Sequence, residues 1–151
     1  MRRLFPALLC ALALGACSSE SDDDGSTGGA SAANCGGKGE TFTAGMSKLG
    51  QNGKLTFVLV SSDPAPPQRY DNLWTIEVKE GDTLLEGATI TVSAKMPGHA
   101  HAPAQVDITE LGAGRYEANP VDLFMIGLWN ITITATSAAG TEDSATFAFC
   151  I

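Results

Sequence analysis

Alternation of apolar and polar residues with a period of two dominates the chain after about residue 55. Residues 88–96 are the clearest case, because their even-numbered positions are apolar and their odd-numbered positions are threonine, serine or lysine. Successive side chains of a β-strand point to opposite faces, so this pattern predicts a strand with one buried face. Similar short apolar or alternating runs predict six further strands, at residues 55–61, 74–79, 105–110, 114–118, 128–136 and 144–151.

Turn and breaker residues separate these runs, and no stretch has a helical period. Pro64, Pro66 and Pro67 end the first strand because proline cannot join a hydrogen-bonded ladder. Seven short strands at regular spacing predict an all-β fold, an immunoglobulin-like antiparallel β-sandwich of about seven strands. The glycine-rich residues 36–53 are expected to be irregular.

The N-terminus has the pattern of an export signal. Arg2 and Arg3 precede an apolar run at residues 4–16, which is shorter than the roughly 20 residues that span a bilayer. Residues 14–17 (LGAC) resemble the lipobox of bacterial lipoproteins. The resemblance implies that residues 1–16 are a removed signal peptide and that Cys17 carries a lipid anchor in a membrane. An ordinary signal peptide with a chance cysteine is the alternative.

The residue directly after Cys17 indicates in which membrane the protein is expected to be anchored. Ser18 follows Cys17 where an aspartate would favour retention in the inner membrane, so the resemblance favours the outer membrane. The protein is therefore expected to be extracytoplasmic, on the periplasmic face or at the cell surface.

Charge and composition divide the rest of the chain. Residues 17–34 are rich in Ser, Gly and Asp and contain no aromatic residue, so they predict a flexible acidic tether. Residues 35–151 then form a single domain. The whole chain of 151 residues has a formal net charge of −8, and an acidic protein repels phosphate backbones, so no nucleic-acid partner is expected.

Two cysteines remain outside the signal and the lipobox. Cys35 and Cys150 lie at the two ends of the predicted domain. In an oxidising compartment such a pair predicts a disulfide, with two free thiols as the alternative. Because Phe147 and Phe149 are assigned to the inward face of the last strand, Cys150 is expected on its outer side.

The sequence contains one cluster with metal-binding chemistry. Met96, His99 and His101 fall within the six residues MPGHAH, where the clearest strand ends, and Met125 is a candidate fourth ligand. Imidazole nitrogens and thioether sulfurs suit copper better than magnesium or calcium. The pattern predicts a copper site at Met96, His99, His101 and Met125.

A structural interpretation of the same cluster stays open. Met96 continues the inward face of its strand and can be a core residue with Met125 packed against it, while the histidines hold the loop. A histidine general base is a weaker alternative, because no nucleophile is placed beside it by the sequence. No catalytic residue is assigned, and the protein is expected not to be an enzyme. Trp74 and Trp129 lie on inward faces and are assigned to the core, with a role as ligand platforms as the less favoured alternative.

The order of several motifs resembles the YtkA-like and FixH-like extracytoplasmic domains. The resemblance covers about residues 73–135 and depends on residues 74–78 (WTIEV), 87–92 (GATITV), 96–101 (MPGHAH), 114–116 (GRY) and 125–129 (MIGLW). It implies a small β-sandwich, and for some FixH-like members a role in assembling copper-containing oxidases. Those members carry a membrane helix, whereas this chain has a lipobox.

Two functions follow from these observations. The first is a membrane-anchored, copper-binding lipoprotein module. The second is a non-catalytic structural or protein-interaction domain of the cell envelope, with an envelope protein as partner and no metal.

Overall fold

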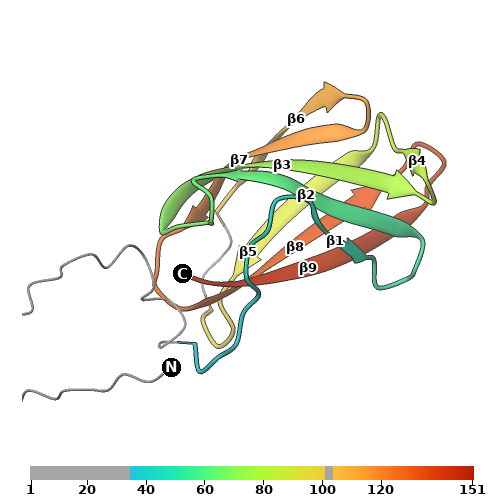
Figure 1. The fold of residues 1–151 in the computed structure, drawn as a ribbon. Coiled ribbons are helices and arrows are strands. Elements are labelled where there is room, and N and C mark those ends of the chain that lie inside the picture. Colours follow the sequence, from blue (N-terminus) through green and yellow to red (C-terminus); the bar gives the residue numbers. More distant parts are fainter. Residues whose placement is uncertain (1–34, 101–103) are drawn as a thin grey trace, which may run out of the picture.

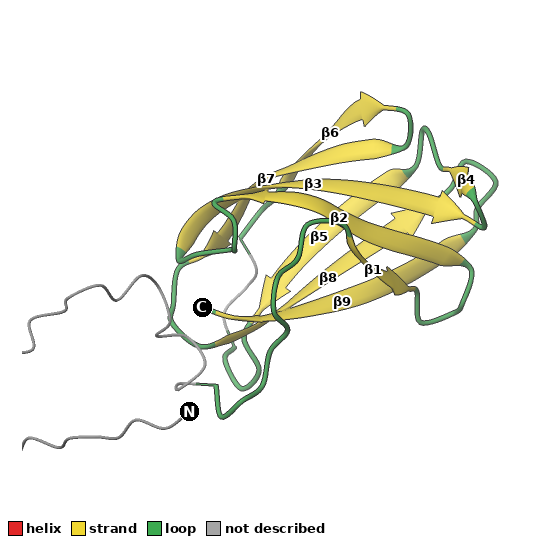
Figure 2. Ribbon diagram, viewed as in Figure 1, coloured by secondary structure: helices red, strands yellow, loops and turns green. Residues whose placement is uncertain are grey.

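The computed structural model describes residues 35–100 and 104–151, and within these ranges it contains nine β-strands and no helix (Figure 2). The predicted signal peptide, the Cys17 lipidation site, the tether and His101 lie outside the described residues. In the part that is described, no helix has the length and hydropathy needed to cross a membrane. The strands are β1 (Met46–Leu49), β2 (Leu55–Asp63), β3 (Tyr70–Glu80), β4 (Thr83–Leu84), β5 (Thr89–Lys95), β6 (Asp107–Gly112), β7 (Arg115–Leu123), β8 (Leu128–Thr136) and β9 (Glu142–Cys150).

Two antiparallel sheets face each other as the layers of a sandwich (Figure 1). The first sheet has the order β1-β2-β3-β7-β6, with β4 paired to β3, and the second has the order β5-β8-β9. Strand β5 contacts β7 and strand β9 contacts β2 across the interior. The predicted all-β antiparallel sandwich is confirmed.

The structure contains two more strands than the seven that the alternation predicts. Strand β1 has four residues within the glycine-rich segment, and β4 has two. Strands this short depend on their pairing with β2 and β3, because two to four residues carry almost no periodic signal. The expectation that residues 36–53 are irregular is therefore wrong for β1.

Strand β7 also runs further than predicted, through Pro120 to Leu123. The pairing between β3 and β7 shifts register between Asn72 and Trp74, opposite Asn119 and Pro120. A proline fits such an irregularity because it has no N–H group to donate to a ladder. The Asn72 side-chain amide donates to the Val121 carbonyl at 3.2 Å and replaces part of the missing pairing.

The core consists of the inward-facing residues of both sheets. The alternation predicted for β8 is confirmed, since Trp129, Ile131, Ile133 and Ala135 are buried. Burial of one large apolar side chain contributes about 1.5–3 kcal/mol to folding. The largest fully buried side chains are Trp74, Tyr116, Phe57, Phe147, Leu55, Leu59, Ile76, Leu123, Ile131, Ile133, Val78 and Val121.

The first described segment covers the free edge of β9. The Glu40 amide donates to the Ala148 carbonyl at 2.6 Å, and the Gln51 amide donates to the Ser144 carbonyl at 2.8 Å. The Lys48 ammonium donates to the Thr146 carbonyl at 2.7 Å and pairs with the Glu40 carboxylate. These bonds satisfy backbone groups that an open strand edge would expose.

A buried carboxylate organises the connection between β1 and β2. Asp143, which is 1% exposed, accepts hydrogen bonds from the backbone amides of Asn52, Lys54, Leu55 and Ser144 at 2.8–3.1 Å. Burial alone raises the pKa of this carboxyl, but the four amides together outweigh it and lower the pKa to about 2. Asp143 thus adds to the backbone hydrogen bonds that fix the conformation of this loop.

Cys35 and Cys150 form a disulfide with a Cα–Cα distance of 6.0 Å. Cys150 is on the outer side of β9, opposite in direction to the buried Phe147 and Phe149, as the alternation predicts. The bond attaches the first described residue to the last strand.

One end of the sandwich, called here the Cys35 pole, carries several chain segments together (Figure 1). It is defined by Cys35, by Met96 at the end of β5, by residues 124–127 between β7 and β8, and by Ile151. The Gly127 amide donates to the Ile151 carbonyl at 2.9 Å, and the Ile151 amide donates to the Gly127 carbonyl at 3.0 Å. These segments are up to 116 positions apart in the sequence, and the sandwich brings them to one end.

Candidate functional site

The described ligand candidates lie at the Cys35 pole. Met96 comes directly after β5, His99 follows it in a turn, and Met125 lies in the connection between β7 and β8. The structure therefore brings the segments of Met96 and Met125 to the same end of the molecule. The use of these side chains as metal ligands remains a prediction.

Met96 continues the inward face of β5. The pairing of β5 with β8 ends with Lys95 opposite Asn130, and one further step sets Met96 opposite Trp129. Its side chain is partly buried and packs against the core. A core position is also what the structural interpretation requires, so burial by itself does not distinguish the two interpretations.

Gly127 provides the space for the Met96 side chain. A Cβ atom built on Gly127 would be 2.6 Å from Met96 Cε, closer than side chains normally approach. The φ angle of Gly127 is 136°, a conformation that L-residues rarely adopt. Glycine at this position therefore lets the terminal methyl group of Met96 lie directly against the backbone before β8.

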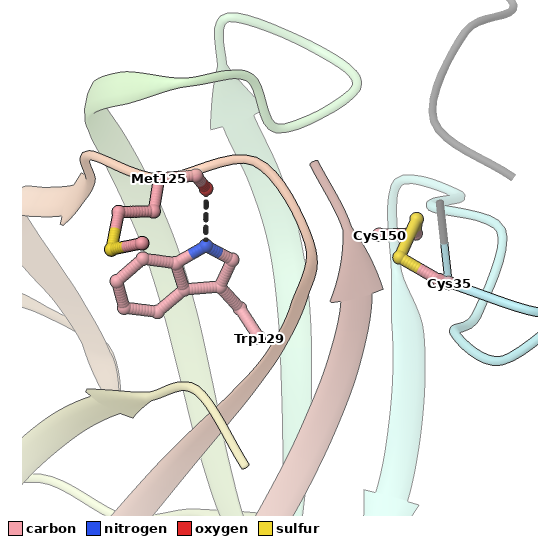
Figure 3. Close-up of a disulfide and its surroundings, with 4 residues drawn as sticks. All are labelled: Cys35, Met125, Trp129 and Cys150. Atoms are coloured by element: carbon pink, nitrogen blue, oxygen red, sulfur yellow. Dashed lines mark hydrogen bonds between the residues drawn. A yellow bond between two sulfur atoms is a disulfide. The ribbon is translucent and has the colours of Figure 1, made fainter. Parts of the chain in front are cut away.

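Met125 is held through its backbone by Trp129. The indole N–H of Trp129 donates to the Met125 carbonyl at 2.8 Å. In Figure 3 the Met125 thioether lies alongside the indole ring of Trp129. Met125 is partly buried and, like Met96, packs against the core.

Two further contacts fix the segment that carries Met125. The Arg69 guanidinium donates through Nε to the Phe124 carbonyl at 2.9 Å. The Phe124 and Trp129 rings meet edge to face, with centroids 5.4 Å apart and an interplanar angle of 76°. Residues 124–127 are thereby attached to the loop before β3 and to the core.

The histidines differ in what the structure describes of them. His99 is exposed, and its backbone amide donates to the Met96 carbonyl at 3.2 Å, which closes a turn over Pro97 and Gly98. His101 lies outside the described residues. Over residues 35–100 and 104–151, no three His, Cys, Asp or Glu side chains gather as a metal site.

The sequence interpretation missed a pair of carboxylates on the outer face of the first sheet. Asp71 on β3 lies directly opposite Asp122 on β7. Burial, followed by the negative charge of Asp71, raises the pKa of the Asp122 carboxyl. The alternation marks both as outward positions, but only the strand register reveals that they are neighbours.

Comparison with known proteins gives one match. A sequence-family model described as YtkA-like matches residues 50–134, which is more than half of the chain. The matched segment begins just before β2 and ends within β8, so it includes Met96, His99, His101 and Met125. No curated protein matches the sequence. No solved structure matches it either.

Proposed function

The chain belongs to the YtkA-like family, and from this premise we propose that it is an extracytoplasmic, lipid-anchored module that binds one copper ion at the Cys35 pole. The family match is consistent with an extracytoplasmic domain. The proposed ligands are Met96, His99, His101 and Met125, and the proposed anchor is a lipid on Cys17. The function is non-catalytic and consists of holding the metal near a membrane surface.

One observation supports the metal site above the others. Met96 and Met125 are 29 positions apart in the sequence, yet both side chains pack against the core at the same end of the sandwich, and His99 follows Met96 by one turn. Thioether and imidazole donors together suit copper. A thioether also has an advantage over a thiolate in an oxidising compartment, because it is not consumed by disulfide formation.

A copper titration tests the site. The protein is the full chain with Cys10→Ser and Cys17→Ser in detergent, so that neither thiol competes for the metal. We expect calorimetry to show one site per chain, with an affinity that falls at least tenfold in a His99→Ala/His101→Ala variant and in a Met96→Leu/Met125→Leu variant. Met46→Leu is the matched control, because Met46 is a partly buried methionine in β1, outside the proposed site.

Two results would contradict the metal site. Equal weak heats for the starting chain and both double variants would leave the structural or protein-interaction role as the better account. If Met46→Leu lost as much copper affinity as the Met96→Leu/Met125→Leu variant, the binding would not be specific to the methionines of the proposed site.

The lipid anchor has its own test. Feeding cells a labelled fatty acid should label the natural chain and leave a Cys17→Ser variant unlabelled, with the variant released from the membrane fraction. Retention of label in Cys17→Ser would exclude this anchor without affecting the copper site.

A further inference from the structure

Trp129 lies between the two segments that carry the proposed sulfur ligands. The pairing of β5 with β8 ends at Lys95 opposite Asn130, so Met96 and Trp129 are the next residues beyond that pair, and the indole N–H of Trp129 donates to the Met125 carbonyl at 2.8 Å. Figure 3 shows the Met125 thioether beside the same ring. The indole is thus bonded to the segment of Met125 and lies at the strand end beside the segment of Met96.

The orientation of this ring is fixed. Trp129 is 3% exposed, and its only polar atom is engaged by Met125. The Phe124 ring contacts it edge to face at 5.4 Å. The hydrogen bond at its N–H group and the contact with Phe124 therefore define the orientation of the ring.

The position of Met96 is fixed from the other side. Its terminal methyl group occupies the space that any side chain at position 127 would fill. Gly127 in turn bonds to Ile151 through both backbone groups, at 2.9 and 3.0 Å. The backbone against which Met96 packs is therefore itself held by the chain terminus.

From these contacts we propose that the face of Trp129, together with the thioethers of Met96 and Met125, selects a soft monovalent cation of the Cu(I) class. This inference rests on the proposed copper site and adds to it the oxidation state and a further residue. Tryptophan has the most favourable ring for cation–π attraction, which acts within about 6 Å of the ring centroid. Thioethers prefer Cu(I) among the copper ions.

Burial also favours the monovalent ion. The cost of moving an ion from water into a medium of low dielectric constant is large, and in the Born description it rises with the square of the charge. Trp129 and both methionines pack against the hydrophobic core. A cation beside this ring loses most of its water, so Cu(II) would lose far more hydration free energy than Cu(I).

Silver provides a redox-inert probe of this site. Ag(I) is titrated in chloride-free buffer into the full chain with Cys10→Ser and Cys17→Ser in detergent, while tryptophan emission and heat are recorded. We expect stoichiometric quenching of roughly half of the tryptophan emission as the site fills. A Trp129→Phe variant should show much weaker quenching, because the remaining tryptophan, Trp74, is fully buried in the core against Phe149 and reports the background. Its Ag(I) affinity should fall about tenfold, in line with a desolvated cation–π contact.

The variants separate a role in binding from a role in packing. Met96→Leu and Met125→Leu conserve side-chain volume, so we expect melting temperatures near that of the starting chain but weaker Ag(I) binding and less quenching. Met46→Leu should match the starting chain in all three measurements. A melting curve for Trp129→Phe shows that this variant is folded before its affinity is compared.

Each outcome has a distinct meaning. Equal Ag(I) affinity in Trp129→Phe and the starting chain, with unchanged emission on binding, would overturn the role of Trp129 and leave the copper site standing. Quenching and affinity that persist at full strength in both methionine variants would also overturn it, because the thioethers would then not hold the cation beside the ring. An absence of Ag(I) and copper binding by the starting chain would overturn both proposals.

Discussion

Asp143 shows how one side chain can fix a loop that has no secondary structure. Four backbone amides converge on its carboxylate, and a Cβ atom at Gly50 would overlap that carboxylate. Hydrogen bonds to a charged group are stronger than those between neutral groups. Asp143 therefore joins the β1–β2 connection to β9, and its contribution to stability depends on the negative charge of its carboxylate.

The charge of Asp143 predicts an acid-sensitive stability. Its pKa is about 2 in the folded protein against an ordinary value of 3.8, so ionisation contributes about 2 kcal/mol to folding. Because the folded-state pKa is the lower one, this contribution is complete above pH 3.8 and is lost as the pH falls towards 2. We expect Asp143→Asn to lower the free energy of unfolding by about 2 kcal/mol at pH 7, measured by urea denaturation.

The difference between the two chains should narrow as the pH falls from 4 to 2. Asp82→Asn, at an exposed turn position between β3 and β4, is the control and should behave like the natural chain. A gap of constant size down to pH 2 would contradict the role of the carboxylate charge.

Ionisation of Asp122 should affect stability in the opposite direction from ionisation of Asp143. Its pKa is raised, by burial and by Asp71, and its Oδ1 atom is buried with no hydrogen-bond partner among the described residues. Ionisation therefore opposes folding, and this penalty develops as the pH rises above 3.8. We expect Asp122→Asn to stabilise the protein at pH 7 by about 0.5 kcal/mol, the scale of a cross-strand pair, with a higher melting temperature.

The Asp122 effect should disappear at low pH. Below pH 3 the Asp122 carboxyl, whose pKa is raised, is largely protonated, so the variant and the natural chain should melt together. A stabilisation of the same size at pH 3 and pH 7 would point to packing as its cause.

At the scale of elements, the Cys35 pole depends on how β5 ends beside the start of β8. Met96 leaves the ladder with β8, and its methyl group fills the position where Gly127 has no side chain. This contact belongs to two elements at once, so the sequence of either strand alone gives no sign of it.

A double-mutant cycle tests this contact. We expect Gly127→Ala to lower the free energy of unfolding by about 2 kcal/mol, because the new methyl group overlaps Met96 and the φ angle of 136° is unfavourable for alanine. In a Met96→Ala background the same change should cost clearly less, since only the backbone strain remains. Equal costs in both backgrounds, measured by urea denaturation, would show that Met96 does not occupy this space.

At the scale of the whole molecule, the disulfide connects the first described residue to the last strand. Cys35 and Cys150 are separated by 115 positions, so the bond closes almost the whole domain into one loop. Closing a loop of this length restricts the unfolded chain more than it changes the folded one. The bond also keeps the Cys35 pole assembled, because Ile151 follows Cys150 and pairs with Gly127.

Removal of the disulfide should therefore destabilise the domain strongly. We expect a Cys35→Ser/Cys150→Ser variant to lose about 4–5 kcal/mol of unfolding free energy, the chain-entropy value for a loop of this length. The measurement is the urea midpoint of the variant and of the natural chain with and without reductant. Alkylation of Cys35 or Cys150 in the absence of reductant would show free thiols and contradict the pairing.

Part of this protein follows from its sequence alone. The period-two alternation determined the sandwich class and the inward faces of β5 and β8, because burial of one face requires that pattern whatever the partner strand is. The spacing of Cys35 and Cys150 predicted the disulfide, and the order of short motifs indicated the YtkA-like family. The MPGHAH segment also marked the region of the candidate site.

Only the tertiary structure decided which distant residues meet. Strand register placed Asp71 beside Asp122, and the end of β5 brought the Met96 methyl group against Gly127. The loop conformation brought four amides to Asp143 and the Met125 carbonyl to the indole of Trp129. Such contacts depend on pairing between segments far apart in the chain, and local propensity carries no information about it. The residues proposed as ligands could be named from the sequence, whereas the packing of Met125 beside Trp129 and of Met96 against Gly127 could not.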